Sequence, residues 1–142
     1  MNRQKMRGFT LFEMLAVLVL LGLIATLMGY AMQNSLRHAA EKKAVVEMVN
    51  ALRSAKTRAL VSGKPQRVTF DLRQRRFYLP GEQGESWPQG LRITLNTAEG
   101  LGSSYAFYPE GGASGGNIVI VGQQRWRIDI AWLTGTASLS QP

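Results

Sequence analysis

The hydropathy pattern is dominated by an uncharged apolar run that extends from Met14 to Ala31. Because the hydrocarbon core of a bilayer requires about 20 residues of helix, this run predicts a membrane-spanning helix. Glu13 stands immediately before the run, and the basic residues Arg3, Lys5 and Arg7 stand before Glu13. The positive-inside rule places these basic residues in the cytoplasm, so the rest of the chain is expected on the far side of the membrane.

After the run, the apolar residues keep to one face of a helix. They recur at spacings of three and four, which is typical of an amphipathic helix, at Leu36, Ala40, Ala44, Val45, Met48, Val49, Leu52, Ala55 and Ala59. Gly63 and Pro65 then provide a helix-stopping signal. We therefore expect one helix of about 50 residues. Its segment 9–32 would lie in the membrane, and its amphipathic segment 33–62 would pack on a globular domain.

The pattern from residue 66 to residue 142 predicts strands and turns. Two pairs of strands flank polar turns and predict hairpins, and strands are expected at Arg67–Leu72, Phe77–Leu79, Leu91–Leu95, Asn117–Val121, Trp126–Trp132 and Thr136–Leu139. Loops are expected at Pro80–Gly90 and Tyr108–Gly116. One helix followed by consecutive antiparallel strands indicates the α+β class, with the helix covering the apolar face of an antiparallel β-sheet domain.

The residues around the start of the apolar run resemble the type IV pilin and type II secretion pseudopilin superfamily. In that superfamily a basic leader ends in a glycine, the mature chain begins with phenylalanine, and its fifth residue is glutamate. Gly8, Phe9 and Glu13 match these three positions. The resemblance implies that residues 1–8 are a leader, cleaved between Gly8 and Phe9, and that the new amino terminus of Phe9 is methylated.

The same resemblance implies a role for Glu13 and a set of partners. Glu13 would pair with the free amine of a neighbouring subunit in a helical filament, because two charges in a low-dielectric setting are each costly alone and tolerable together. The implied partners are a prepilin peptidase, an inner-membrane assembly platform, other major and minor pseudopilins, and a secreted substrate. The implied location is the bacterial inner membrane, with the globular domain in the periplasm.

A second stretch of the sequence narrows the resemblance. Phe107–Gly111 reads aromatic-x-Pro-x-Gly and leads through a glycine-rich loop into a strand pair that is followed by Gly135. This pattern is similar to the carboxy-terminal part of H-type minor pseudopilins and of the related minor pilins of the type IV pilus. It implies a minor subunit that helps to start filament assembly and so supports the export of folded proteins.

Charge keeps a second function open. Removal of Arg3, Lys5 and Arg7 leaves 14 basic against 9 acidic residues, and without Glu13 the exposed part is +6. A basic surface of this kind fits nucleic acid or anionic lipid as a partner. The alternative interpretation is therefore a minor type IV pilin that binds DNA for uptake.

The cluster of Arg73, Arg75 and Arg76 has two interpretations as well. It is either a charged hairpin tip that keeps a strand edge soluble or a contact for DNA phosphates or a protein partner. Nearby aromatic residues such as Phe77 and Trp126 either stack on bases or form the core. Trp87, which precedes Pro88, is expected in a loop as a partner contact.

Enzymatic and metal chemistry find little support in the sequence. His38 is the only histidine and there is no cysteine, so metal-ligand clusters, disulfides and a Ser/His/Asp set are not expected. The glycines between Gly111 and Gly116 lack the Lys-Ser/Thr ending of a phosphate-binding loop. We predict a protein that is not an enzyme and that has neither a cofactor nor a bound metal.

Overall fold

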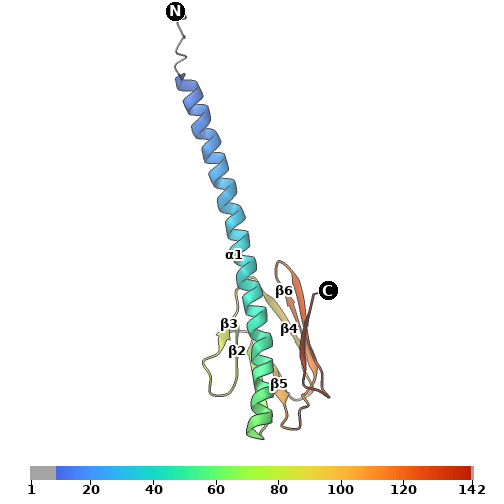
Figure 1. Ribbon diagram of the computed structural model, residues 1–142. Helices are drawn as coiled ribbons and strands as arrows, with labels where there is room; N and C mark the ends of the chain where they lie inside the picture. The colour runs from blue at the N-terminus through green and yellow to red at the C-terminus, as the bar shows by residue number, and fades with distance from the viewer. Residues whose placement is uncertain (1–8, 142) are drawn as a thin grey trace, which may run out of the picture. The chain divides into compact units, whose positions relative to one another are not determined.

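The computed structural model describes residues 9–141 (Figure 1). Helix α1 extends over Leu11–Ser62. The strands are β1 (Gln66–Asp71), β2 (Arg76–Tyr78), β3 (Glu85–Ser86), β4 (Arg92–Asn96), β5 (Ser104–Phe107), β6 (Gly116–Val121), β7 (Arg125–Ile130) and β8 (Ala137–Ser140). The chain divides into two units, and the boundary between them in the sequence lies between Arg37 and His38.

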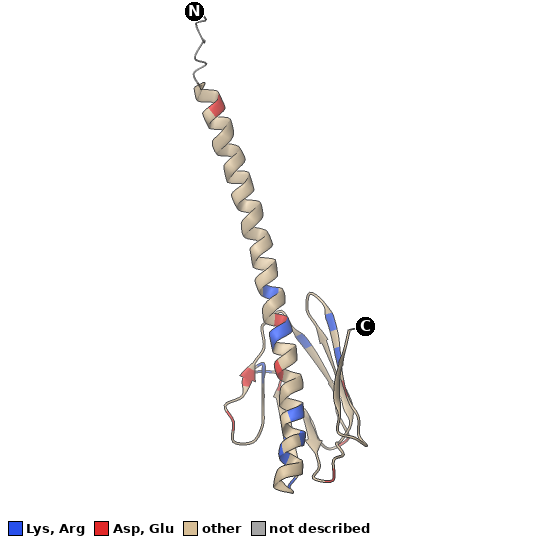
Figure 2. Cartoon of the chain, viewed as in Figure 1, with Lys and Arg blue, Asp and Glu red and all other residues tan. Residues whose placement is uncertain are grey.

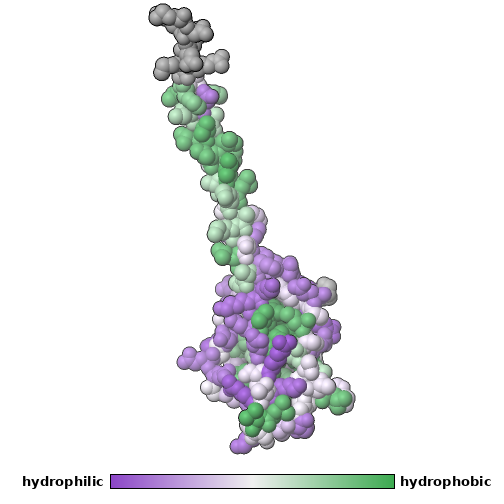
Figure 3. Space-filling view, in the orientation of Figure 1, coloured by the Kyte–Doolittle hydropathy of each residue, from purple (hydrophilic) through white to green (hydrophobic). Residues whose placement is uncertain are grey.

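In the first unit, the described residues are almost entirely the apolar part of α1. Leu11–Leu36 is exposed along its whole length, and Figure 3 shows this part of the helix as largely green. It holds the one window, within the described residues, that is long and apolar enough to cross a membrane, and none of that window is buried. An exposed apolar helix of this length is stable only in lipid or against other helices.

The second unit packs residues 38–62 of α1 against two antiparallel sheets, with strand orders β3-β2-β1-β5 and β4-β6-β7-β8. The structure forms both predicted hairpins, β1–β2 and β6–β7. Figure 1 shows the second half of α1 lying across the strands. One core joins all three layers, and its largest fully buried side chains include Met48, Leu52, Phe70, Phe77, Tyr105, Phe107, Ile118, Ile120, Trp126 and Ile128.

Two strands lie where none was predicted. All four residues of β5 (Ser104–Phe107) are buried, so the strand lacks the polar and apolar alternation that marks a half-exposed strand. Strand β3 (Glu85–Ser86) lies inside the segment expected to be a loop, and its two exposed residues carry no periodic signal. The expectation that Pro80–Gly90 is entirely loop is therefore wrong, and β5 completes the first sheet by pairing with β1.

The prediction that Trp87 is an exposed partner contact is also wrong. Its side chain is 5% exposed and its ring stacks on Phe77 at a centroid distance of 6.3 Å. The Trp87 backbone N–H donates to the Arg75 carbonyl oxygen at 3.1 Å, which draws the indole over the first sheet. Trp87 does lie in a loop after β3, but the large aromatic surface of its ring is buried in the core rather than presented to a partner.

Tyr105 connects the two sheets through its hydroxyl group. Its ring is fully buried and the hydroxyl donates to the Asn117 carbonyl oxygen at 2.7 Å, with the Asn96 carbonyl oxygen at 3.3 Å. Tyr105 belongs to β5 of the first sheet, whereas Asn96 and Asn117 belong to β4 and β6 of the second. Burial raises the pKa of the Tyr105 hydroxyl, although the hydrogen bond to Asn96 partly opposes this shift.

The raised pKa predicts a loss of stability in alkaline solution. The folded protein keeps the Tyr105 proton at a pH where the unfolded chain, with an ordinary tyrosine pKa of about 10, loses it. The contribution of the protonated Tyr105 hydroxyl to the unfolding free energy is therefore complete below pH 10. Above pH 10 the unfolding free energy falls by about 1.4 kcal/mol per pH unit. Urea unfolding of the full chain in detergent between pH 8 and pH 11 measures this fall. The Tyr105→Phe variant should show a shallower decline, and equal slopes would contradict the prediction.

Candidate functional site

The start of α1 holds the first candidate site, built around Glu13. The Glu13 N–H donates to the Thr10 carbonyl oxygen at 3.1 Å and lies 3.3 Å from Thr10 Oγ1, so Thr10 caps the helix. Glu13 is exposed in the first turn of the helix, where the helix dipole favours a negative charge. Figure 2 shows this acidic segment as the one charged part of the apolar half of α1. An accessible carboxylate on an apolar helix can pair with a cation on another subunit.

The sequence contains a signal for this cap that is independent of the apolar pattern and of the leader motif. Thr10 and Glu13 have the Ser/Thr-x-x-Glu spacing of a helix-capping box. Phe9 is 70% exposed just before the cap. Gly8, on the other side of the expected cleavage site, lies outside the described residues together with Arg3, Lys5 and Arg7.

The three arginines of the predicted cluster differ in their contacts, because Arg76 is hydrogen-bonded to a loop whereas Arg73 and Arg75 are exposed in a turn. Arg76 donates from Nη2 to the Gly84 carbonyl oxygen at 3.0 Å and so holds the loop before β3. Arg73 and Arg75 are exposed in the β1–β2 turn, which is closed by N–H groups that donate to Asp71 Oδ1. Arg75 lies in this turn with φ at 52°. Arg73 and Arg75 therefore remain free to contact a partner.

The aromatic residues near these arginines do not form a surface for stacking bases. Phe77 and Trp126 are both 2% exposed and belong to the core, while Tyr78 is 40% exposed on β2. Arg92, Arg125 and Arg127 lie on the second sheet, so the structure does not join them to the β1–β2 turn. The combined basic and aromatic surface that the DNA-binding interpretation needs is not assembled at this hairpin.

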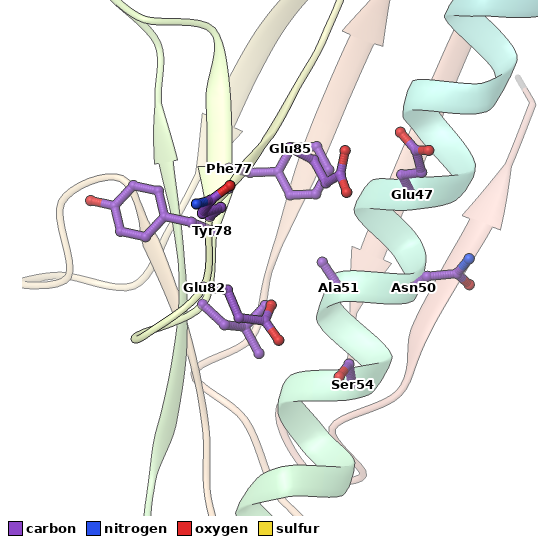
Figure 4. Close-up of a pocket in the computed structure, with 11 residues that line it drawn as sticks. Glu47, Asn50, Ala51, Ser54, Phe77, Tyr78, Glu82 and Glu85 are labelled. Atoms are coloured by element: carbon purple, nitrogen blue, oxygen red, sulfur yellow. The ribbon is translucent and has the colours of Figure 1, made fainter.

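A groove of about 270 Å³ lies between α1 and the segment from β2 to β3. Figure 4 shows Glu47 and Ser54 on the helix side, across from the strand and loop that carry Tyr78, Glu82 and Glu85, whereas the Asn50 side chain points away from them. Two of the three carboxylates are engaged, because Lys43 pairs with Glu47 at 3.6 Å and Arg58 pairs with Glu82. The lining contains hydroxyl, amide and carboxylate groups but no histidine or cysteine.

Glu41 is a buried carboxylate that no local sequence pattern predicts. Its side chain is 5% exposed and Oε2 accepts the Gln123 N–H at 2.9 Å. A Cβ atom on Gly122 would lie 2.4 Å from Glu41 Oε2, and a Cβ on Gly90 would lie 3.4 Å from Oε1. Two glycines therefore leave room for the carboxylate, which fixes α1 to the β6–β7 turn.

Loss of this contact should destabilise the second unit. We expect Glu41→Ala to lower the unfolding free energy by about 1–3 kcal/mol, because it leaves the Gln123 N–H without its acceptor. Glu41→Gln keeps an acceptor oxygen and should recover most of that loss. Chemical denaturation in detergent measures both variants. Glu99→Ala removes an exposed carboxylate and should change the stability by less than about 0.5 kcal/mol; an equal effect of Glu41→Ala would refute the contact's role.

Comparison with known proteins agrees with this geometry. Residues 3–29 match the prokaryotic N-terminal methylation motif. The chain is 31% identical over 139 residues to type II secretion system protein H of Xanthomonas campestris pv. campestris, and the match covers 94% of this chain and 82% of that protein. The minor pseudopilin EpsH from the type 2 secretion system of Vibrio cholerae has a similar fold, with a TM-score of 0.58 at 17% identity over 72% of this chain and 98% of that chain.

A methylation motif, a long apolar helix and a helix packed on antiparallel sheets are the features of a pilin-like protein. Within that class, the chain belongs to the family of type II secretion system protein H. The resemblance seen in the leader and in the Phe107–Gly135 pattern is confirmed, as is the α+β fold class. The apolar helix and the family fit a protein anchored in the inner membrane. Neither relative is described as an enzyme.

Proposed function

We propose that this chain acts as a minor pseudopilin that enters the type II secretion pseudopilus through its N-terminal helix. It would be made as a precursor with leader 1–8, cut between Gly8 and Phe9 by a prepilin peptidase and methylated on Phe9. Its family membership supports the minor pseudopilin role, and the methylation motif at residues 3–29 supports the processing.

Assembly depends on the exchange of lipid for protein around the apolar part of α1. Before assembly, segment 9–32 is held in the inner membrane and the globular domain lies in the periplasm. Extraction becomes favourable when Glu13 pairs with the Phe9 amine of a neighbouring subunit, because the pair neutralises two charges that are costly in an apolar setting. The exposed apolar side chains of Leu11–Leu36 then pack against neighbouring helices.

The partners follow from this role. The chain would contact other major and minor pseudopilins in the filament and the inner-membrane assembly platform that inserts them, with a secreted protein as a further contact. Arg73 and Arg75 are the exposed side chains that we assign to a protein partner at the filament surface. The comparisons favour secretion and add no support to the alternative of DNA uptake by a type IV pilus.

The observation that carries this proposal is the exposed apolar helix that begins with a capped, accessible Glu13. Cysteine cross-linking in living cells tests it, since the chain has no cysteine of its own. A cysteine at Val19, which is 58% exposed, should form a disulfide with a cysteine placed in the N-terminal helix of another pseudopilin. A chain that stays uncrosslinked in actively secreting cells would contradict incorporation.

A further inference from the structure

The outer face of the second sheet is positively charged at one end. Arg92 on β4 opposes Val121 on β6, and Val121 opposes Arg125 on β7. Paired residues of neighbouring strands point to the same face, so the two arginines flank Val121 in one row. Arg127 follows in the next row on this face and Asp129 in the third. The charge therefore changes from positive to mixed along the strands.

No salt bridge within the described residues neutralises the two arginines of the first row, although the buried Glu41 carboxylate lies at the same end of the sheet. Arg92 and Arg125 are exposed, and neither forms a salt bridge within residues 9–141. Arg127, by contrast, pairs with Asp129 at 2.8 Å. The free positive charge is thus concentrated at the end of the sheet formed by the start of β4 and the β6–β7 turn.

Glu41 places this end of the sheet beside the first turn of α1 in the second unit. Its carboxylate accepts the Gln123 N–H and lies close to Gly90. Gln123 precedes Arg125 by two residues, and Gly90 precedes Arg92 by two. Lys42, the neighbour of Glu41, is exposed at the same end. Figure 2 shows blue segments on α1 and on the strands in this part of the unit.

The first turn of the second unit follows closely after the apolar run in the sequence. The apolar run ends at Ala31, and Met32–Arg37 leads to the second unit. As helix, these steps span about 10 Å at about 1.5 Å per residue, while the headgroup layer outside the hydrocarbon core is roughly 5–8 Å thick. Whatever the orientation of the unit, its first turn is within about one Debye length, near 8 Å at physiological salt, of the headgroups.

We propose that Arg92 and Arg125, with Lys42, dock the second unit on anionic phospholipid headgroups before the subunit enters a filament. Guanidinium groups bind phosphate through paired N–H donors, which suits a phospholipid surface. Nucleic acid carries phosphate as well, but only the membrane is held next to these arginines by the anchor, which gives it a high effective concentration. Extraction of the helix would move the arginines beyond the screening length and release them.

The inference rests on the membrane anchoring of segment 9–32, so the test reads anchoring and docking separately. The full chain, with a single cysteine at Gln123 that carries a fluorophore, is reconstituted in nanodiscs of neutral phosphatidylcholine or of phosphatidylcholine with phosphatidylglycerol. Co-elution with neutral nanodiscs reports anchoring. Quenching of the fluorophore by quencher-bearing headgroups reports docking, and a label at exposed Thr134 in the β7–β8 loop serves as the reference position.

Docking predicts strong quenching at position 123 in anionic nanodiscs, weak quenching in neutral ones, and loss of the difference in high salt. Arg92→Gln with Arg125→Gln should lower the ratio of docked to undocked protein roughly 30-fold, given the usual contribution of an arginine at an anionic surface. Lys64→Gln with Arg67→Gln removes the same charge from two exposed side chains at the start of the first sheet and should leave the ratio unchanged.

Three results would overturn the proposal. One is equal quenching in neutral and anionic nanodiscs that hold the anchored chain. Another is an equal loss in the Lys64/Arg67 control, which would make the effect one of net charge. The third is a response of the position 123 label to short duplex DNA that exceeds the response to anionic lipid and disappears in the Arg92/Arg125 variant, which would assign the face to nucleic acid.

Discussion

Replacement of Glu13 by alanine is expected to leave leader cleavage and methylation intact and to reduce incorporation into the pseudopilus by about 10- to 100-fold. The reason is that the Phe9 amine of a neighbouring subunit would enter the helical core without its counter-charge, and an unpaired buried charge is strongly destabilising. Mass spectrometry of the mature amino terminus shows whether the leader is cleaved and Phe9 is methylated. The yield of the Val19→Cys cross-link in cells measures incorporation into the pseudopilus.

Glu47→Ala provides the matched control for this experiment, since it removes a carboxylate from the same helix. Glu47 pairs with Lys43 on the surface of the second unit, where an exposed ion pair contributes less than about 1 kcal/mol. This variant should cross-link as well as the unmodified chain. Normal cross-linking by Glu13→Ala, with processing intact, would remove the proposed role of Glu13.

The largest effect on stability is expected at Gly116, the first residue of β6. Its φ of +116° is accessible to glycine alone, and a Cβ atom there would lie 2.2 Å from the Asn96 carbonyl oxygen. The added Cβ atom would also lie 3.1 Å from Tyr105 Cε1. Strands β4, β5 and β6 would therefore have to separate. We expect Gly116→Ala to lower the unfolding free energy by about 3 kcal/mol or more.

Gly102→Ala separates the backbone strain from this clash. Gly102 has a φ of +59°, but no heavy atom lies within 4 Å of a Cβ placed there. That substitution should cost about 1 kcal/mol, the ordinary penalty of a left-handed conformation. Urea denaturation of both variants in detergent makes the comparison, and a loss at Gly116 no greater than that at Gly102 would contradict the packing described for β6.

The sequence predicted the elements that have a periodic apolar pattern or that are bounded by turn-forming and helix-stopping residues. The helix was evident because the apolar run continues into a three-and-four stripe that ends before Gly63 and Pro65. Both hairpins were evident because polar turns separate alternating strands. Gly8, Phe9 and Glu13 were selected by their spacing within the leader motif, which is a short local segment, and their roles in processing and assembly stay predictions.

The remaining features depend on contacts between distant residues. Strand β5 is buried throughout, so its sequence has no alternation to detect. Glu41 had the appearance of a solvated helix residue, because its partner Gln123 is 82 positions away. Trp87 lies in a loop as expected, but its burial depends on the stacking of its ring on Phe77, which no local pattern shows. The positive end of the second sheet is likewise assembled from β4 and β7 by register, which no local pattern reveals.

Secretion in a strain that lacks this gene tests the central claim most directly. Culture supernatant and periplasm are assayed for the exported enzymes of the host, with the unmodified gene and the Glu13→Ala variant returned in turn. A minor pseudopilin predicts enzymes trapped in the periplasm, released again by the unmodified gene but not by the variant. Undiminished secretion without the gene would contradict the assignment, and loss of DNA uptake in the same strain would transfer the chain to a type IV pilus.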